Sequence, residues 1–229
     1  MGLTRELVQA MVSKNSFGVA PHMVCANQSK EEITELATSY WNMGVRKIVA
    51  LRGDITDSTH GGDFKHATEL VKHLKSLFDF EICVAGYPEC HPESPSQSED
   101  IKRLKEKTDA GANQVITQFF FDPEVYLRFR DLAVKEGVKI QITPGILPVL
   151  NFKSLVNFAA KCQANVPPFL HKMFAESPED EAGQRLLAMN VMTHQITKLI
   201  DNGVENFHFY TLNELTLTSQ TCRWLNTAF

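Results

Sequence analysis

Four copies of one short pattern restrict what this chain can fold into. In each copy a stretch with helical spacing ends on a glycine, Val or Ala follows, and an apolar run begins within a few residues; the glycines are Gly44, Gly111, Gly137 and Gly203. Glycine in this place is typical of a helix C-cap, because the left-handed conformation needed there is inexpensive only without a Cβ. The pattern predicts helices that alternate with strands.

The apolar runs provide six strand candidates, at residues 18–25, 47–51, 81–87, 114–119, 139–143 and 206–210. Several are almost continuously apolar, as expected of parallel strands that are covered on both faces. The helices between them have clear start signals. Ser29 with Glu32 predicts a capping box, and Asp122 before Pro123 predicts a cap followed by proline at the first helical position.

The spacing of the glycines corresponds to βα units of roughly 30 residues, which is the repeat of an eight-fold barrel. A doubly wound open sheet is the alternative. Residues 3–12 read as a helix with no strand before it, and a short extra helix is expected after Pro167 and Pro168. We therefore expect an α/β chain of the (β/α)8 TIM barrel family. It forms a single domain over residues 1–229, an incomplete barrel with about six βα units, a leading helix and no first two strands.

Composition excludes several classes of protein. A formal charge of -4, with 43% apolar and 22% charged residues, lacks the basic excess that nucleic acid or an anionic membrane favours. No apolar run approaches the roughly 20 residues of a membrane-spanning helix, and no signal peptide is recognisable, so we expect a cytoplasmic protein. Five scattered cysteines without CxxC spacing predict buried thiols, not disulfides or a zinc site.

Polar residues after predicted strands are candidates for function, because the active site of a parallel barrel lies at the carboxyl ends of its strands. Arg52-Gly53-Asp54 directly follows a strand candidate and could place a carboxylate there, although a surface turn with an Arg-Asp pair is an equal alternative. His22 lies inside the first strand run. A lone histidine there is more often a hydrogen-bonded core residue than a ligand.

The loop from Tyr87 to Glu93 follows the third strand candidate, and two prolines stiffen it. Tyr87 and His91 in this loop suit contact with a flat cofactor. In the next helix, Asp100, Arg103 and Lys107 share one face and could hold a ribose and a pyrophosphate, although most such triplets are only solvated.

Gln118 interrupts an otherwise apolar run, so its amide needs partners from the fold or from a ligand. Residues 208–213 lie at the end of the last strand candidate. They either pack in the core or form the wall that closes the barrel. The sequence contains no GxGxxG, Walker, HExxH or GxSxG motif.

Six segments in the same order resemble methylenetetrahydrofolate reductase of the bacterial type. They cover nearly the whole chain: 51–54 (LRGD), 87–93 (YPECHPE), 109–112 (DAGA), 116–121 (ITQFFF), 144–148 (PGILP) and 208–213 (HFYTLN). The resemblance implies an FAD-containing (β/α)8 barrel that uses NADH or NADPH to reduce 5,10-methylenetetrahydrofolate to 5-methyltetrahydrofolate for methionine synthesis. It also implies a homo-oligomer with no bound metal.

The resemblance also assigns roles to individual residues. Those implied to line FAD are His22, Arg52, Gly53, Asp54, Ala67, Tyr87, His91, Ser94, Asp100, Arg103, Glu106 and Lys107. Asp54 would lie near the flavin ring and the pterin and act electrostatically in catalysis. Gln118 would contact the substrate or the nicotinamide. Ser154 and Phe158 would line a site that these two ligands occupy in turn, which implies a ping-pong order.

The chain departs from the family at three places. The general acid of the family is a glutamate in a Phe-Glu-Phe-type segment, and these 229 residues contain no such segment. The second strand, with its flavin-contacting threonine, is absent as well. Glu214 stands where an arginine that binds the folate tail is usual. A non-catalytic FAD-binding or subunit-interacting fragment is therefore the alternative to an active reductase, whereas an unrelated barrel such as an aldolase would require six coincidences.

Overall fold

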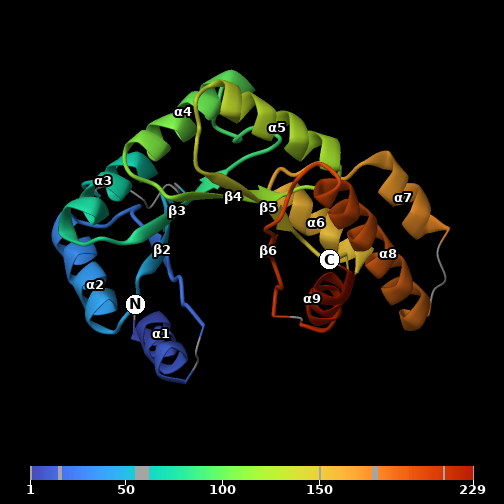
Figure 1. The fold of residues 1–229 in the computed structure, drawn as a ribbon, viewed down its shortest axis with the longest axis horizontal. Coiled ribbons are helices and arrows are strands. Elements are labelled where there is room, and N and C mark those ends of the chain that lie inside the picture. The colour runs from blue at the N-terminus through green and yellow to red at the C-terminus, as the bar shows by residue number, and fades with distance from the viewer. Residues whose placement is uncertain are drawn as a thin grey trace. The chain divides into compact units, whose positions relative to one another are not determined.

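The computed structural model describes residues 2–14, 17–54, 62–149, 151–176, 180–213 and 215–228. Helices and strands alternate through most of this part of the chain (Figure 1). Their bounds are α1 Gly2–Lys14, β1 His22–Val24, α2 Lys30–Asn42, β2 Lys47–Leu51, α3 Ala67–Leu77, β3 Glu81–Gly86, α4 Gln97–Asp109, β4 Gln114–Phe119, α5 Pro123–Lys135, β5 Gln141–Ile146, α6 Phe152–Lys161, α7 Pro168–Ala175, α8 Glu181–Ile200, β6 His208–Phe209 and α9 Thr216–Ala228.

The strands form a sheet in the order β1-β2-β3-β4-β5-β6, which is also their order in the sequence. The pairs β1 with β2, β2 with β3, and β5 with β6 are parallel. A doubly wound sheet reverses its strand order at a switch point, so this order excludes that alternative. The predicted fold class, a βα-barrel arrangement with a leading helix, is confirmed.

Local signals in the sequence located several helix ends correctly. All four predicted C-cap glycines have a positive φ, between +80° and +113°. In the capping box of α2, the Ser29 hydroxyl accepts from the Glu32 N–H at 3.1 Å, and the Ser29 N–H donates to the Glu32 carboxylate at 2.8 Å. Helix α5 begins at Pro123, and the Asp122 carboxylate accepts the N–H of Glu124 at 3.0 Å.

Four strand predictions were wrong at their ends. Strand β3 ends at Gly86, one residue earlier than predicted, and β6 comprises only His208–Phe209 of the predicted run 206–210. Only His22–Val24 of the predicted run 18–25 forms β1. Strand β5 runs from Gln141 to Ile146, whereas the prediction was 139–143. It continues through Pro144 because the next N–H, that of Gly145, donates to the buried Thr117 hydroxyl at 2.9 Å.

The chain divides into two compact units, each with a core of its own. The first comprises Met1–Gly86, Ile101–Ile116 and Glu136–Ile142, and the second comprises Tyr87–Asp100, Thr117–Lys135 and Thr143–Phe229. In the first unit, apolar side chains of α2 and α3 are buried with those of β2 and β3, among them Ile33, Leu70, Leu74, Ile48 and Ile82.

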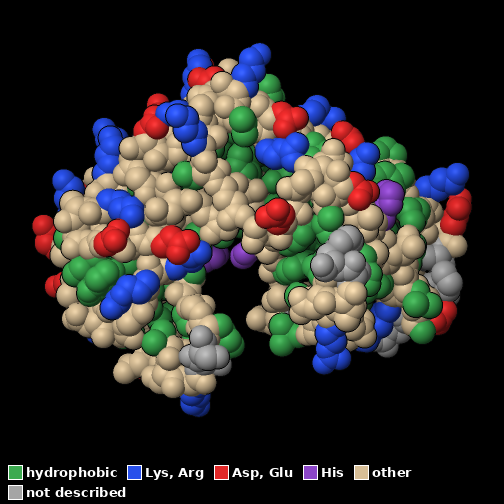
Figure 2. All heavy atoms as spheres, in the orientation of Figure 1, with side chains coloured by type: hydrophobic (Ala, Val, Ile, Leu, Met, Phe, Trp, Pro, Cys, Tyr) green, Lys and Arg blue, Asp and Glu red, His purple; other side chains and the backbone are tan. Residues whose placement is uncertain are grey.

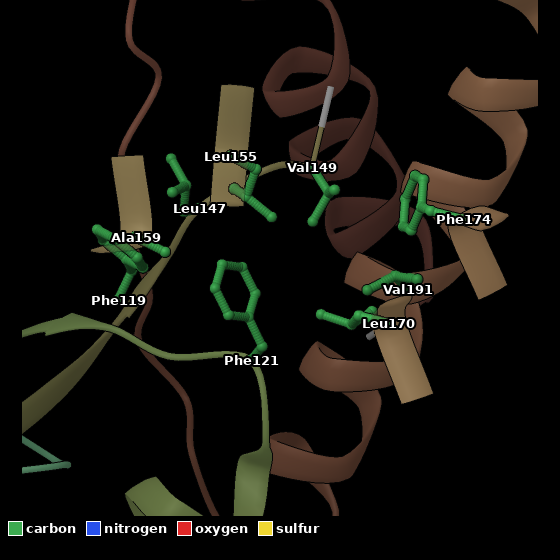
Figure 3. Packing of buried hydrophobic residues seen from close by; sticks show 9 residues of the cluster. All are labelled: Phe119, Phe121, Leu147, Val149, Leu155, Ala159, Leu170, Phe174 and Val191. Atoms are coloured by element: carbon green, nitrogen blue, oxygen red, sulfur yellow. The ribbon is translucent and has the colours of Figure 1, made fainter. Parts of the chain in front are cut away.

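The core of the second unit contains residues from strand β4, from the segments that follow β4 and β5, and from helices α6, α7 and α8 (Figure 3). Its buried members are Phe119, Phe121, Leu147, Val149, Leu155, Ala159, Leu170, Phe174 and Val191. Ring stacking adds to the packing, since Phe152 and Phe174 lie 4.7 Å apart between centroids with almost parallel planes.

Cysteine burial differs from the prediction. Cys25 and Cys83 are buried, Cys90 and Cys162 are partly exposed, and Cys222 is exposed. Cys222 lies on α9, where its side chain faces away from the core, so the prediction of buried thiols was wrong there.

The surface carries charges of both signs. Figure 2 shows Lys and Arg side chains interspersed with Asp and Glu over the face turned to the viewer. Among the described residues, no helix is both long and apolar enough to span a membrane.

Candidate functional site

Strands β1 and β2 stay paired beyond their last residues, which fixes the turn that follows β2. The Cys25 N–H donates to the Leu51 carbonyl at 3.1 Å, and the Ala26 N–H donates to the Arg52 carbonyl at 2.8 Å. Gly53 then has φ +87°, and a Cβ on this residue would lie 2.3 Å from Cγ1 of Val24. Only glycine fits this position, because any side chain would be both strained and in collision.

The polar neighbours of this turn lie at the carboxyl end of the strands. The Arg52 side chain donates from Nε to the Gly53 carbonyl at 3.2 Å, and Asp54 is exposed. His22 is on the exposed side of β1, although partial burial lowers the pKa of its imidazole. The neutral ring is therefore favoured at pH 7. The exposure of the side chain argues against the alternative of a core histidine.

Two helices add further candidate residues in the first unit. Ala67 is the first residue of α3, and Arg103, Glu106 and Lys107 lie on α4. The Lys107 ammonium donates to the Ala85 carbonyl near the end of β3 at 2.6 Å. Arg103 and Glu106 are exposed. Asp100, which lies on the same helix, is only 7% exposed. The predicted FAD residues of α4 therefore differ in how far they are buried.

The remaining flavin candidates form a connected cluster in the second unit. The Asp100 carboxylate accepts from the His91 N–H at 3.2 Å and from the Ser94 hydroxyl at 3.4 Å. The rings of Tyr87 and His91 meet edge to face, 4.5 Å between centroids. Gln97 on α4 donates to the Pro88 carbonyl at 3.1 Å. These contacts hold the loop after β3 against the start of α4.

Glu89 in the same loop has a structural contact. Its carboxylate accepts the N–H of Asn165 at 2.7 Å. Burial raises the pKa of this carboxyl, and nearby Asp122 raises it further, while the hydrogen bond from Asn165 opposes them. The side chain thus ties the loop to the segment before α7.

Besides Asp54, the predicted substrate residues are three that lie on β4 and α6. Gln118 is partly buried, and its side-chain oxygen accepts the N–H of Phe119 at 3.1 Å. Phe158 stacks on Phe119, with 5.5 Å between centroids and 19° between planes. Ser154 has an exposed side chain, and its backbone N–H donates to the side-chain oxygen of Asn151, the N-cap of α6, at 2.9 Å.

Sequence reasoning missed several residues that support these positions. Thr117 is fully buried, and its hydroxyl and its carbonyl accept hydrogen bonds from Gly145 and Tyr210, respectively. Gln195 of α8 is buried and donates to the Phe120 carbonyl at 2.6 Å. Thr117 and Gln195 form these hydrogen bonds with residues that are distant in sequence. The only local signal for them is a polar residue among apolar neighbours. Glu214 lies outside the described residues.

The arrangement can bind and orient organic groups. Within the described segments, no group of three His, Cys, Asp or Glu side chains is placed to hold a metal ion. Carboxylates, cations, aromatic rings and a partly buried amide follow successive strands. The fold and these residues define the class: a βα-barrel protein with polar side chains near the carboxyl ends of its strands.

Comparison with known proteins identifies the family. The family described as methylenetetrahydrofolate reductase matches residues 1–226, and the chain belongs to this family. A 5,10-methylenetetrahydrofolate reductase of Buchnera aphidicola (from Schizaphis graminum) is 43% identical over 96% of this chain and 75% of its own length. The Escherichia coli K12 protein of the same name is 41% identical over 97% of this chain and 75% of its own length.

Solved structures support the fold alone. An uncharacterised protein from Clostridium thermocellum, described as binding two copies of 5-methyl-5,6,7,8-tetrahydrofolic acid, has a TM-score of 0.53 at 14% identity over 82% of this chain and 64% of its own. A putative phosphonomutase from Burkholderia cenocepacia has the same TM-score at 11% identity, covering all of this chain and 76% of its own.

Proposed function

We propose that this chain is a flavin-dependent reductase that converts 5,10-methylenetetrahydrofolate to 5-methyltetrahydrofolate with NADH or NADPH. Membership of the family supports the reaction class. The observation that carries the proposal for this chain is the turn after β2. There Gly53 lets the backbone pass against Val24, so that Arg52 and Asp54 lie together at the strand end.

The donor set of the chain fits FAD. Arg103 and Lys107 are cations suited to a diphosphate, and the buried Asp100 carboxylate is suited to ribose hydroxyls. The edge-to-face pair of Tyr87 and His91 offers aromatic surface to a flat ring. The other residues proposed to hold the cofactor are His22, Arg52, Gly53, Asp54, Ala67, Ser94 and Glu106. When bound, FAD would carry a hydride from the nicotinamide to the folate.

Asp54 is proposed to act on the folate by charge. Opening the five-membered ring of 5,10-methylenetetrahydrofolate gives a cationic iminium, which must form before the methylene carbon accepts a hydride. A fixed carboxylate next to this cation lowers its free energy more than that of the neutral closed ring. Asp54 is exposed, so its side chain is accessible to a substrate.

Gln118, Ser154 and Phe158 are proposed to line the place that nicotinamide and folate occupy in turn. The stack of Phe158 on Phe119 presents an aromatic face, and the partly buried Gln118 side chain supplies amide hydrogens at the end of β4. One shared place supports a ping-pong order, because the oxidised nicotinamide has to leave before folate enters.

The second candidate function is FAD binding without turnover of folate. The sequence contains no Phe-Glu-Phe segment with the acid that protonates the folate nitrogen. Glu89 is a weak substitute, because its carboxylate is engaged with the N–H of Asn165. In this case the chain would still accept a hydride from NADH and deliver it to an artificial acceptor.

One set of assays separates the two candidates. The chain is purified with FAD, and NADH oxidation is followed with a quinone and then with 5,10-methylenetetrahydrofolate as acceptor. Activity with both supports the reductase, and activity with the quinone alone supports the second candidate. Protein that binds no FAD would contradict both.

The Asp54→Asn variant tests the role of the carboxylate. We expect the folate rate to fall by about 100-fold, a typical loss for one electrostatic group, relative to the quinone rate of the same FAD-loaded variant. Asp79→Asn is the matched control, since Asp79 is an almost fully exposed carboxylate in the same unit. Equal effects of the two substitutions on the folate rate would contradict the assignment.

The homo-oligomer implied by the family is part of the same proposal. Light scattering coupled to size-exclusion chromatography should give a mass that is a multiple of the chain mass. A monomeric mass at the concentration used for the assays would contradict the homo-oligomer.

A further inference from the structure

Tyr210 reaches from the end of β6 across β5 to β4. Its N–H donates to the Ile146 carbonyl at 2.9 Å, which keeps the chain beside β5 one residue beyond β6. Its hydroxyl donates to the Thr117 carbonyl at 2.9 Å. The strand crossed in between contributes Gly145. A Cβ there would lie 2.6 Å from Cε2 of Tyr210 and 2.3 Å from the Thr117 carbonyl oxygen. The ring can cross β5 only because Gly145 has no side chain.

Strands β4 and β5 are tied a second time at Thr117. The fully buried Thr117 hydroxyl accepts the Gly145 N–H at 2.9 Å. The Thr117 carbonyl, which Tyr210 contacts, belongs to the peptide group that joins Thr117 to Gln118. Two long-range hydrogen bonds, one to its side chain and one to its carbonyl, therefore hold Thr117, the residue immediately before Gln118.

The Tyr210 hydroxyl is itself held in one direction. The Tyr210 ring packs edge to face against His208 at 4.8 Å and against Phe119 at 6.0 Å between centroids. Burial raises the pKa of the hydroxyl to about 12, so it remains protonated and able to donate at neutral pH. Gln118 in turn contacts the N–H of Phe119 through its side-chain oxygen, which leaves its amide hydrogens to a ligand.

We propose that Tyr210 is a positioning residue for substrate binding, which acts on Gln118 through the Thr117 carbonyl. The inference rests on the proposed function, which makes Gln118 a contact of the folate. Tyr210 need not touch the ligand, since its effect is to hold the Gln118 peptide where the amide meets the folate.

The test uses FAD-loaded protein and the product 5-methyltetrahydrofolate, so that it does not depend on the general acid. Its dissociation constant is measured by titration for wild type, Tyr210→Phe, Gln118→Ala and the double variant. Tyr210→Phe keeps the ring and removes one hydrogen bond, so we expect binding to weaken by roughly five- to tenfold. In the Gln118→Ala background the same change should alter binding by less than about twofold.

Tyr126→Phe is the matched control, because Tyr126 is a buried tyrosine of the same unit with a pKa likewise raised to about 12 by burial. Thermal unfolding is followed for all variants, and Tyr126→Phe should leave folate binding unchanged whatever it does to stability. Equal losses from Tyr210→Phe in both backgrounds, or no loss in either, would overturn the positioning role alone. Wild-type protein that binds FAD but no 5-methyltetrahydrofolate would instead overturn the proposed function, and the inference with it.

Discussion

At Gly53 a single residue decides whether the chain can turn after β2. Its φ of +87° lies in the left-handed region, and its missing Cβ leaves room for the Val24 side chain. Gly203 has a similar φ of +80° but nothing within 4 Å of the Cβ position. The two glycines therefore separate the cost of backbone strain from the cost of a collision.

Gly53→Ala should lower the free energy of unfolding more than Gly203→Ala. We expect about 1 kcal/mol from backbone strain at Gly203, and about 3 kcal/mol or more at Gly53, where strain and overpacking combine. Urea denaturation of both variants measures the difference. Equal losses would show that Val24 gives way easily and that Gly53 is not required by packing.

Glu89 carries a pH dependence with a defined sign. Because burial raises the pKa of this acid in the folded state, the folded chain binds a proton more tightly than the unfolded chain. Its ionisation therefore destabilises the fold as the pH rises from the ordinary pKa of a glutamate through the raised value.

The Glu89→Gln variant removes this ionisation and keeps an oxygen that can accept the Asn165 N–H. We expect the variant to be more stable relative to wild type at pH 7 than at pH 4, which means that its free energy of unfolding minus that of wild type is larger at pH 7. Urea denaturation at the two pH values measures this difference. A relative stability that does not change with pH, or that improves toward pH 4, would contradict the raised pKa.

At the scale of elements, the parts that could be predicted are those with local causes. Gly44 and the three other C-cap glycines indicate helix ends, because the positive φ needed at a helix end favours glycine at that position, whatever the rest of the fold. Ser29 and Glu32 mark a helix start for the same reason. The continuation of β5 past Pro144 depends on Thr117, which lies on another strand, so no local signal could reveal it.

The capping box gives a prediction for one helix. Ser29→Ala removes the hydroxyl that accepts the Glu32 N–H, and we expect a loss of about 1 kcal/mol in unfolding free energy. Ser13→Ala is the control, because the Ser13 hydroxyl bonds only back to the Gln9 carbonyl within exposed α1, where alanine is the better helix former. A loss from Ser13→Ala as large as that from Ser29→Ala, measured by chemical denaturation, would contradict the capping role.

The candidate site was predictable to the extent that strand ends identify it. Arg52, Gly53 and Asp54 follow β2, and Gln118 lies next to the end of β4, as the sequence indicated. Their supports were not predictable. The hydroxyl of Tyr210 and the carbonyl of Thr117 are 93 positions apart, and neither residue differs by type from an ordinary core residue.

At the scale of the whole molecule, the chain combines the strand order of a βα barrel with family motifs along nearly its full length. The roles of the individual residues and the single domain over residues 1–229 stay predictions. The motifs lie in both compact units, so flavin binding has to be measured on the intact chain.

The most direct measurement is anaerobic reduction of the FAD-loaded chain by NADH or NADPH, followed by the loss of flavin absorbance. If the chain is a flavin-dependent reductase of its family, the oxidised flavin spectrum should bleach on mixing and return when a quinone is added. FAD that binds but stays oxidised in the presence of either nicotinamide would contradict the account.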